Sequence, residues 1–125
     1  MDIRDRADEI RERLDDITGP HPTAAELALV VRLIRSFAGK TAVGAGRLGE
    51  LLRGGDAAAV RDQAHAMRGS ASNIGAGRLA AIFADVEHAA RDGRVPEPDV
   101  TLGRITAEQA LVLGILDEVA AELDP

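Results

Sequence analysis

The chain has 125 residues, a formal net charge of −6 and no cysteine, which excludes a disulfide framework and a thiolate metal site. No apolar run approaches the roughly 20 residues that cross a bilayer, and the charged N-terminus lacks the apolar segment of a signal peptide. We therefore expect a single soluble, cytoplasmic domain over residues 1–125, with no membrane segment and too few aromatic residues to bind nucleic acid by base stacking.

The first predicted element is an amphipathic helix over about residues 3–17. Its apolar residues recur every three or four positions, as on one face of a helix. They are Ile3, Ala7, Ile10, Leu14 and Ile17. The stretch Thr18–Pro22 holds two prolines and a glycine, which end this helix. Thr23 and Glu26 then have the spacing of a capping box, which predicts the start of a second helix.

The second helix is predicted to continue as far as Arg53. Three glycines interrupt its apolar stripe, so the segment could be one long helix or two shorter ones, and we favour one. They are Gly39, Gly44 and Gly46. The pair Gly54 and Gly55 ends it, and Asp56 is a natural N-cap for a third helix that ends near Asn73 or Ile74.

Two further helices complete the predicted fold. Gly75 and Gly77 mark a tight turn into a fourth helix that stops near Gly93, and residues 95–99 form a loop before a fifth helix over 101–123. No segment has the alternating pattern of a strand. The sequence therefore predicts an all-α protein, with an antiparallel four-helix bundle over about residues 23–123 and an additional N-terminal helix across one end.

The third helix carries the most informative residue, His65. On a helical projection the apolar residues of this segment form a narrow stripe that faces the core. They are Val60, Ala64, Met67, Ala71 and Ile74. His65 lies about 140° from that stripe and points to solvent. Gly69, one turn later, costs about 1 kcal/mol relative to alanine in a helix, so helix stability does not explain its presence.

The residues around His65 resemble the histidine-containing phosphotransfer (HPt) family. That family's pattern is an alanine-histidine pair, a leucine or methionine, lysine-glycine-serine, then glycine-alanine before the next helix. Here it reads Ala64-His65, Met67, Arg68-Gly69-Ser70 and Gly75-Ala76, followed by Leu79 and by Val86-Glu87. Arg68 departs from the family's lysine but keeps the positive charge.

The resemblance implies roles for individual side chains. His65 would be the phosphoacceptor, and Glu87 would hydrogen-bond its other ring nitrogen and so orient the imidazole. Arg68 can bind phosphate oxygens bidentately. Gly69 would leave room for a partner surface. Arg61 and Ser72, on the same exposed flank, would contact that partner.

We therefore expect a carrier in a two-component phosphorelay that has no ATP site and is not an enzyme. Its partners would be response-regulator receiver domains, a histidine kinase, or both. It would need no cofactor, because Mg²⁺ would belong to the receiver, and a monomer is expected. The alternative is an HPt-like module that docks the same partners without being phosphorylated. A metal-bundle enzyme is excluded, because neither His65 nor the other two histidines, His21 and His88, has a glutamate three residues before it.

Overall fold

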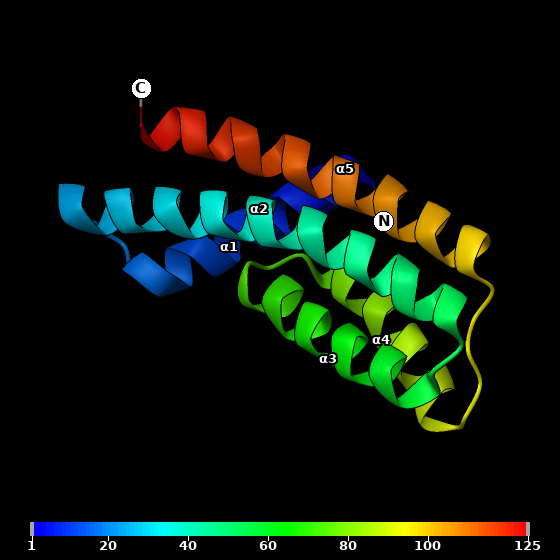
Figure 1. Ribbon diagram of the computed structural model, residues 1–125. Coiled ribbons are helices and arrows are strands. Elements are labelled where there is room, and N and C mark those ends of the chain that lie inside the picture. Colours follow the sequence, from blue (N-terminus) through cyan, green and yellow to red (C-terminus); the bar gives the residue numbers. More distant parts are fainter. Residues whose placement is uncertain (1, 125) are drawn as a thin grey trace.

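A computed structural model describes residues 2–124, and its architecture is the predicted all-α bundle (Figure 1). The five helices are α1 (Ile3–Thr18), α2 (Ala24–Gly54), α3 (Ala57–Asn73), α4 (Gly77–Arg91) and α5 (Pro98–Leu123). Helices α2 to α5 run antiparallel in succession, and none of the described residues lies in a strand. Within residues 2–124 no helix is both long and apolar enough to span a bilayer.

The prediction of one long second helix is confirmed. Thr23 makes both bonds of the capping box with Glu26, at 3.1 Å each, and α2 continues unbroken to Gly54. Gly39 and Gly46 face open space, whereas a Cβ on Gly44 would lie 2.8 Å from Cε of Met67. Gly44 therefore lets α3 pack closely against the middle of α2.

The predicted start of the fifth helix was three residues too late. Helix α5 begins at Pro98 instead of Thr101. The side chain of Glu97 accepts hydrogen bonds from the backbone N–H groups of Asp99 and Val100, at 3.1 and 2.6 Å. Proline suits the first position of a helix, because it has no N–H group to satisfy there. The segment 95–99 is thus partly the first turn of α5 rather than all loop.

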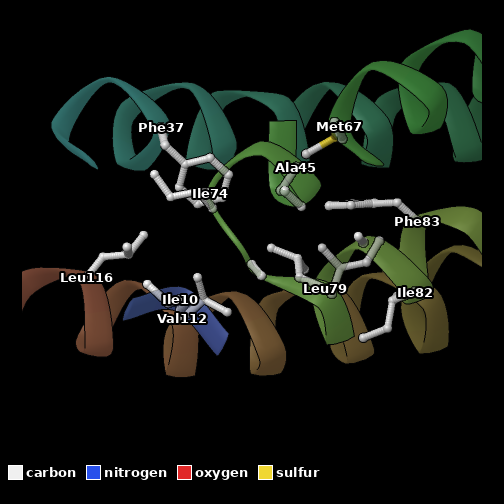
Figure 2. Packing of buried hydrophobic residues seen from close by; sticks show 14 of the residues in the cluster. Ile10, Phe37, Ala45, Met67, Ile74, Leu79, Ile82, Phe83, Val112 and Leu116 are labelled. Atoms are coloured by element: carbon white, nitrogen blue, oxygen red, sulfur yellow. The ribbon is translucent and has the colours of Figure 1, made fainter. Parts of the chain in front are cut away.

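The hydrophobic core lies between α2, α3, α4 and α5, and the predicted stripe of α3 faces it (Figure 2). All five apolar residues of that stripe are buried. The predicted stripe of α1 is only partly right: Ile10 and Leu14 are buried, whereas Ile3 and Ile17 are exposed. Helix α1 therefore contributes to the core mainly through Ile10 and Leu14, with Ala7 packed against it.

Helix α1 packs beside the α3–α4 turn, where α2 and α5 extend beyond the two shorter helices (Figure 1). Arg13 Nε donates to the carbonyl of Asn73 at 3.0 Å, and the backbone N–H of Gly77 donates to Glu9 Oε1 at 2.7 Å. A cation thus lies at the C-terminus of α3 and an anion at the N-terminus of α4, where the helix dipoles favour them. No side chain of α4's own caps its N-terminus, so α1 supplies that cap.

A bidentate ion pair fixes the other half of α1. Arg6 donates to both carboxylate oxygens of Glu108 on α5, at 2.6 and 2.7 Å. Both side chains are largely covered, with 12% and 6% exposure. Such fork-shaped pairs carry geometric specificity as well as energy. Helix α1 is therefore held in place on α5 as well as at the α3–α4 turn.

Candidate functional site

His65 projects from the outer face of α3, as the helical projection predicted. Its neighbour Ala64 is fully buried, whereas the side chain of His65 is 65% exposed. Ala64 and the rest of the stripe fix the rotation of α3 about its axis against the core. The imidazole of His65 therefore points to solvent. The fold therefore presents this ring to any protein that approaches α3.

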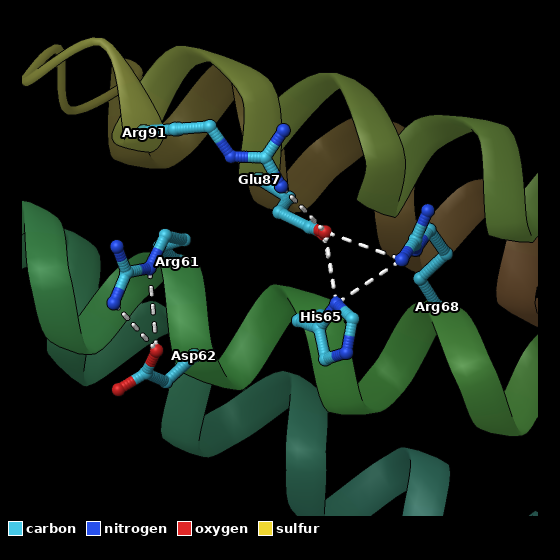
Figure 3. A network of polar contacts seen from close by, with 6 residues as sticks. All are labelled: Arg61, Asp62, His65, Arg68, Glu87 and Arg91. Carbon is cyan, nitrogen blue, oxygen red and sulfur yellow. Dashed lines mark hydrogen bonds and ion pairs between the residues drawn. The ribbon is translucent and has the colours of Figure 1, made fainter.

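Glu87 reaches His65 from the adjacent helix. Its carboxylate oxygens lie 3.0 and 3.1 Å from Nδ1 of the imidazole (Figure 3). An ionised carboxylate can only accept hydrogen bonds, so this contact requires a proton on Nδ1. The lone pair of the neutral ring is then on Nε2, the nitrogen that does not face Glu87. The expected contact between His65 and Glu87 is thus present, and it leaves a nucleophilic nitrogen free.

Arg68 lies in the same cluster, on the Nδ1 side of the ring. Its Nη2 is 3.1 Å from His65 Nδ1 and 3.4 Å from Glu87 Oε1. Nδ1 cannot donate to Glu87 and also accept from Arg68. The arginine is therefore held by the negative charge of Glu87. In this arrangement Arg68 is an ion-pair partner of Glu87, and it is not aimed at Nε2.

Arg91 is a member of the cluster that the sequence analysis missed. It lies one turn after Glu87 on α4, and its Nη2 is 3.6 Å from Glu87 Oε1. Figure 3 shows Arg68 and Arg91 on opposite sides of the carboxylate. A signal was available, since a glutamate followed four residues later by an arginine is a favourable helical ion pair.

The Glu87 side chain is almost completely covered, with 3% exposure. The hydrogen bond to His65 lowers the pKa of Glu87 most, burial opposes that shift, and electrostatic interactions with Arg68, His65 and Arg91 lower the pKa further. Glu87 is therefore an anion near neutral pH. The side chains of His65, Arg68 and Arg91 surround it.

The residues predicted to contact a partner all lie on the exposed side of α3, but they do not form one cluster. Arg61 pairs with its neighbour Asp62 at 3.2 Å instead of approaching His65. Ser72 is exposed one turn beyond Gly69. A Cβ added to Gly69 would meet nothing within 4 Å, so this glycine is not pressed against a neighbouring helix.

A cavity of about 440 Å³ lies on the other side of α3, between α1, α2 and α3. Ala66 and Ser70 on α3 line it, facing the partly exposed apolar side chains of Ile17 and Leu33. Lys40 adds a positive charge to its lining. The lining of this cavity therefore combines apolar contact area with a basic residue, as protein-binding surfaces often do.

Comparison with known proteins identifies the family. The Hpt domain family matches residues 32–123, which is well over half of the chain. The chain belongs to the Hpt domain family. This Hpt domain is also similar to the crystal structure of histidine-containing phosphotransfer protein B (HptB) from Pseudomonas aeruginosa PAO1. The TM-score is 0.70 at 27% sequence identity, over 74% of this chain and 80% of that one. A comparison with curated protein sequences finds no match.

The other histidines of this Hpt domain have no comparable surroundings. His21 is exposed in the loop between α1 and α2, and His88 is exposed on α4 with Asp92 3.7 Å away. Residues 2–124 contain no cluster of three or more histidine, aspartate or glutamate side chains placed to hold a metal ion. The cluster around His65 is therefore the candidate site.

Proposed function

We propose that this Hpt domain carries a phosphoryl group on Nε2 of His65 within a two-component phosphorelay. The observation that carries the proposal is the contact of His65 Nδ1 with Glu87, combined with the exposure of the ring. A phosphocarrier needs a neutral imidazole with an accessible lone pair, and this arrangement supplies one on the outward nitrogen.

The proposed step transfers a phosphoryl group from the phosphoaspartate of a receiver domain. The Nε2 lone pair forms the new P–N bond while the P–O bond to the aspartate breaks, which regenerates the free carboxylate of the receiver. The ring keeps its proton on Nδ1 and gains positive charge. The Glu87 carboxylate at 3.0 Å offsets that charge, and the reverse step restores the neutral imidazole.

Arg68 is the proposed phosphate clamp, and Gly69 the proposed access residue. The Arg68 guanidinium could turn from Glu87 toward a phosphoryl group on Nε2 and bind two of its oxygens. The open space at Gly69 would let a receiver bring its aspartate close to the ring. Arg61 and Ser72 would lie under the docked partner.

The proposed role is that of a carrier and not of an enzyme. It needs no cofactor of its own, since the Mg²⁺ for transfer would be bound by the receiver, and the phosphoryl group would come from a receiver or a histidine kinase. We place it in the cytoplasm as a monomer. The module that docks without phosphorylation has no observation in its favour, because the histidine is present and exposed.

The experiment that tests the proposal is incubation with a phosphorylated receiver. We expect the protein to acquire acid-labile, alkali-stable phosphate that His65→Gln abolishes and the matched control His88→Gln leaves unchanged. Phosphate that persists in His65→Gln would remove His65 from its role. Failure of the wild type with a broad panel of receivers and kinases would favour the docking module instead.

A further inference from the structure

The inference concerns the second arginine on Glu87. One carboxylate oxygen, Oε1, receives His65 Nδ1 at 3.0 Å, Arg68 at 3.4 Å and Arg91 at 3.6 Å. Two guanidinium groups thus share a single carboxylate. The orientation of His65 requires only the first of these contacts, so the presence of two arginines needs a separate explanation.

The position of Arg68 provides that explanation. Its guanidinium lies next to Nδ1, whereas under the proposed function the phosphoryl group is attached to Nε2, on the other side of the ring. Arg68 must therefore leave Glu87 before it can bind the phosphoryl oxygens. The Glu87 side chain, which is 3% exposed, loses one of its two arginines in that movement, and a covered carboxylate left without any cation would be costly.

Arg91 is placed to compensate the negative charge of Glu87 when Arg68 moves away. It lies on α4 with Glu87, in the favourable order of acid before base at a spacing of four residues. Its side chain is 60% exposed, so it adds little to the core. Figure 3 shows it on the side of Glu87 away from Arg68, where movement of Arg68 would not displace it.

We propose that Arg91 is a positioning residue that keeps Glu87 compensated, so that Arg68 can move from Glu87 to the phosphoryl group on His65. This inference rests on the proposed phosphocarrier function. Arg91 itself contacts neither the imidazole nor the phosphoryl group. Without it, Arg68 would be the sole guanidinium group on Glu87 and would be released less readily.

The first test needs no partner and measures the titration of the Glu87 carboxylate by NMR in the free protein. Arg91→Ala should raise the pKa of Glu87, because one of the charges that lower it is removed. Arg94→Ala is the matched control, since that exposed arginine pairs with Asp92 instead, at 3.4 Å. An unchanged Glu87 titration in Arg91→Ala would overturn the inference, whatever the outcome of phosphorylation experiments.

The second test measures the rate of His65 phosphorylation, both from a phosphorylated receiver and from phosphoramidate, a small donor that has no docking surface. In the phosphoramidate reaction the P–N bond to ammonia breaks as the bond to Nε2 forms. We expect Arg91→Ala to slow both reactions about fivefold, with receiver affinity and the melting temperature unchanged, and Arg91→Lys to restore most of the rate.

Two double variants decide whether Arg91 acts through Glu87 and Arg68. The effect of Arg91→Ala should disappear in a Glu87→Gln background, where no carboxylate holds Arg68, and in an Arg68→Ala background, where nothing is released. The same fivefold loss in either background would show that Arg91 acts independently, and would overturn the inference. If the wild type accepts no phosphate from either donor, the proposed function fails, and the Glu87 titration still decides whether Arg91 compensates Glu87.

Discussion

Gly69 and Gly75 lie close together in the sequence but in opposite steric situations. A Cβ at Gly69, inside α3, would meet nothing within 4 Å. A Cβ at Gly75, just past the end of α3, would lie 2.7 Å from Cβ of Arg13 and 3.0 Å from the backbone carbonyl oxygen of Glu9. Gly75 also has a φ of +84°, which side-chain-bearing residues rarely adopt. One glycine thus leaves an outer surface open, and the other lets two helices touch.

The two glycines should therefore respond oppositely to alanine. Gly69→Ala should raise the free energy of unfolding by about 0.5 to 1 kcal/mol, because a helix-interior glycine is replaced without a clash. Gly75→Ala should lower it by about 1 to 3 kcal/mol or more, since backbone strain is added to a collision with α1. Urea unfolding followed by circular dichroism measures both. Destabilisation by Gly69→Ala would mean that this position has a packing role.

A long side chain at Gly69 should separate folding from function. We expect Gly69→Gln to melt at or above the wild-type temperature, because the space around this position is open. Receiver binding and phosphotransfer should weaken at least about tenfold, a loss of about 1.4 kcal/mol, because the side chain would stand beside the imidazole. Calorimetric titration with a receiver measures the affinity. A variant that is stable and fully active would exclude the access role.

Removal of Arg68 should affect transfer far more than stability. The side chain is 41% exposed, and Glu87 retains contacts with His65 and Arg91 when it is lost. Arg68→Ala should therefore change the free energy of unfolding by no more than about 0.5 kcal/mol, as surface substitutions usually do. Single-turnover transfer from a receiver should slow, and Arg68→Lys should keep most of the rate. Equal rates for Arg68→Ala and the wild type would refute the clamp.

The stability of the wild type should depend more steeply on acid pH than that of Glu87→Gln. The pKa of Glu87 is lowered from its usual 4.5, chiefly by the hydrogen bond to His65. Stability from a carboxylate with a lowered folded-state pKa is fully present above the usual value, and it is lost as the pH falls through the lowered one. Urea unfolding at about pH 6 and about pH 3 compares the two proteins, which share all other carboxylates. Parallel pH profiles would contradict this prediction.

Much of the fold could be predicted because its signals are local. The capping box at Thr23 and Glu26 and the N-cap at Asp56 each involve residues three apart, and the structure contains their bonds. The rotation of α3, and with it the exposure of His65, follows from a stripe of apolar residues within one helix. The late start predicted for α5 came from interpreting residues 95–99 as a loop, although the proline at position 98 is of a type favoured at the first position of a helix.

The contacts of α1 could not be predicted, because they join residues far apart in the chain. Nothing near Glu9 or Arg13 in the sequence indicates that they bind Gly77 and Asn73. Gly75 and Gly77 were interpreted as marking a turn; Gly75 lies in that turn and Gly77 is the first residue of α4. Their close contacts with α1 depend on which helix lies against them. The prediction that Glu87 meets His65 came from the family resemblance, since sequence spacing alone does not set the register of α3 against α4.

Glu9 and Arg13 of α1 bind the two helix ends at the α3–α4 turn, yet α1 lies outside the segment that the Hpt family matches. The Hpt match begins at residue 32, inside α2, and excludes Glu9 and Arg13 altogether. A recombinant fragment cut at that boundary would retain His65 and Glu87 but leave the Asn73 carbonyl and the Gly77 N–H to water, and it would uncover the core face beneath Ile10 and Leu14. The α3–α4 turn connects the helix of His65 to the helix of Glu87. In such a fragment this turn would unfold locally before the rest. Fragment boundaries for this protein are better chosen from its side-chain contacts than from the limits of its family.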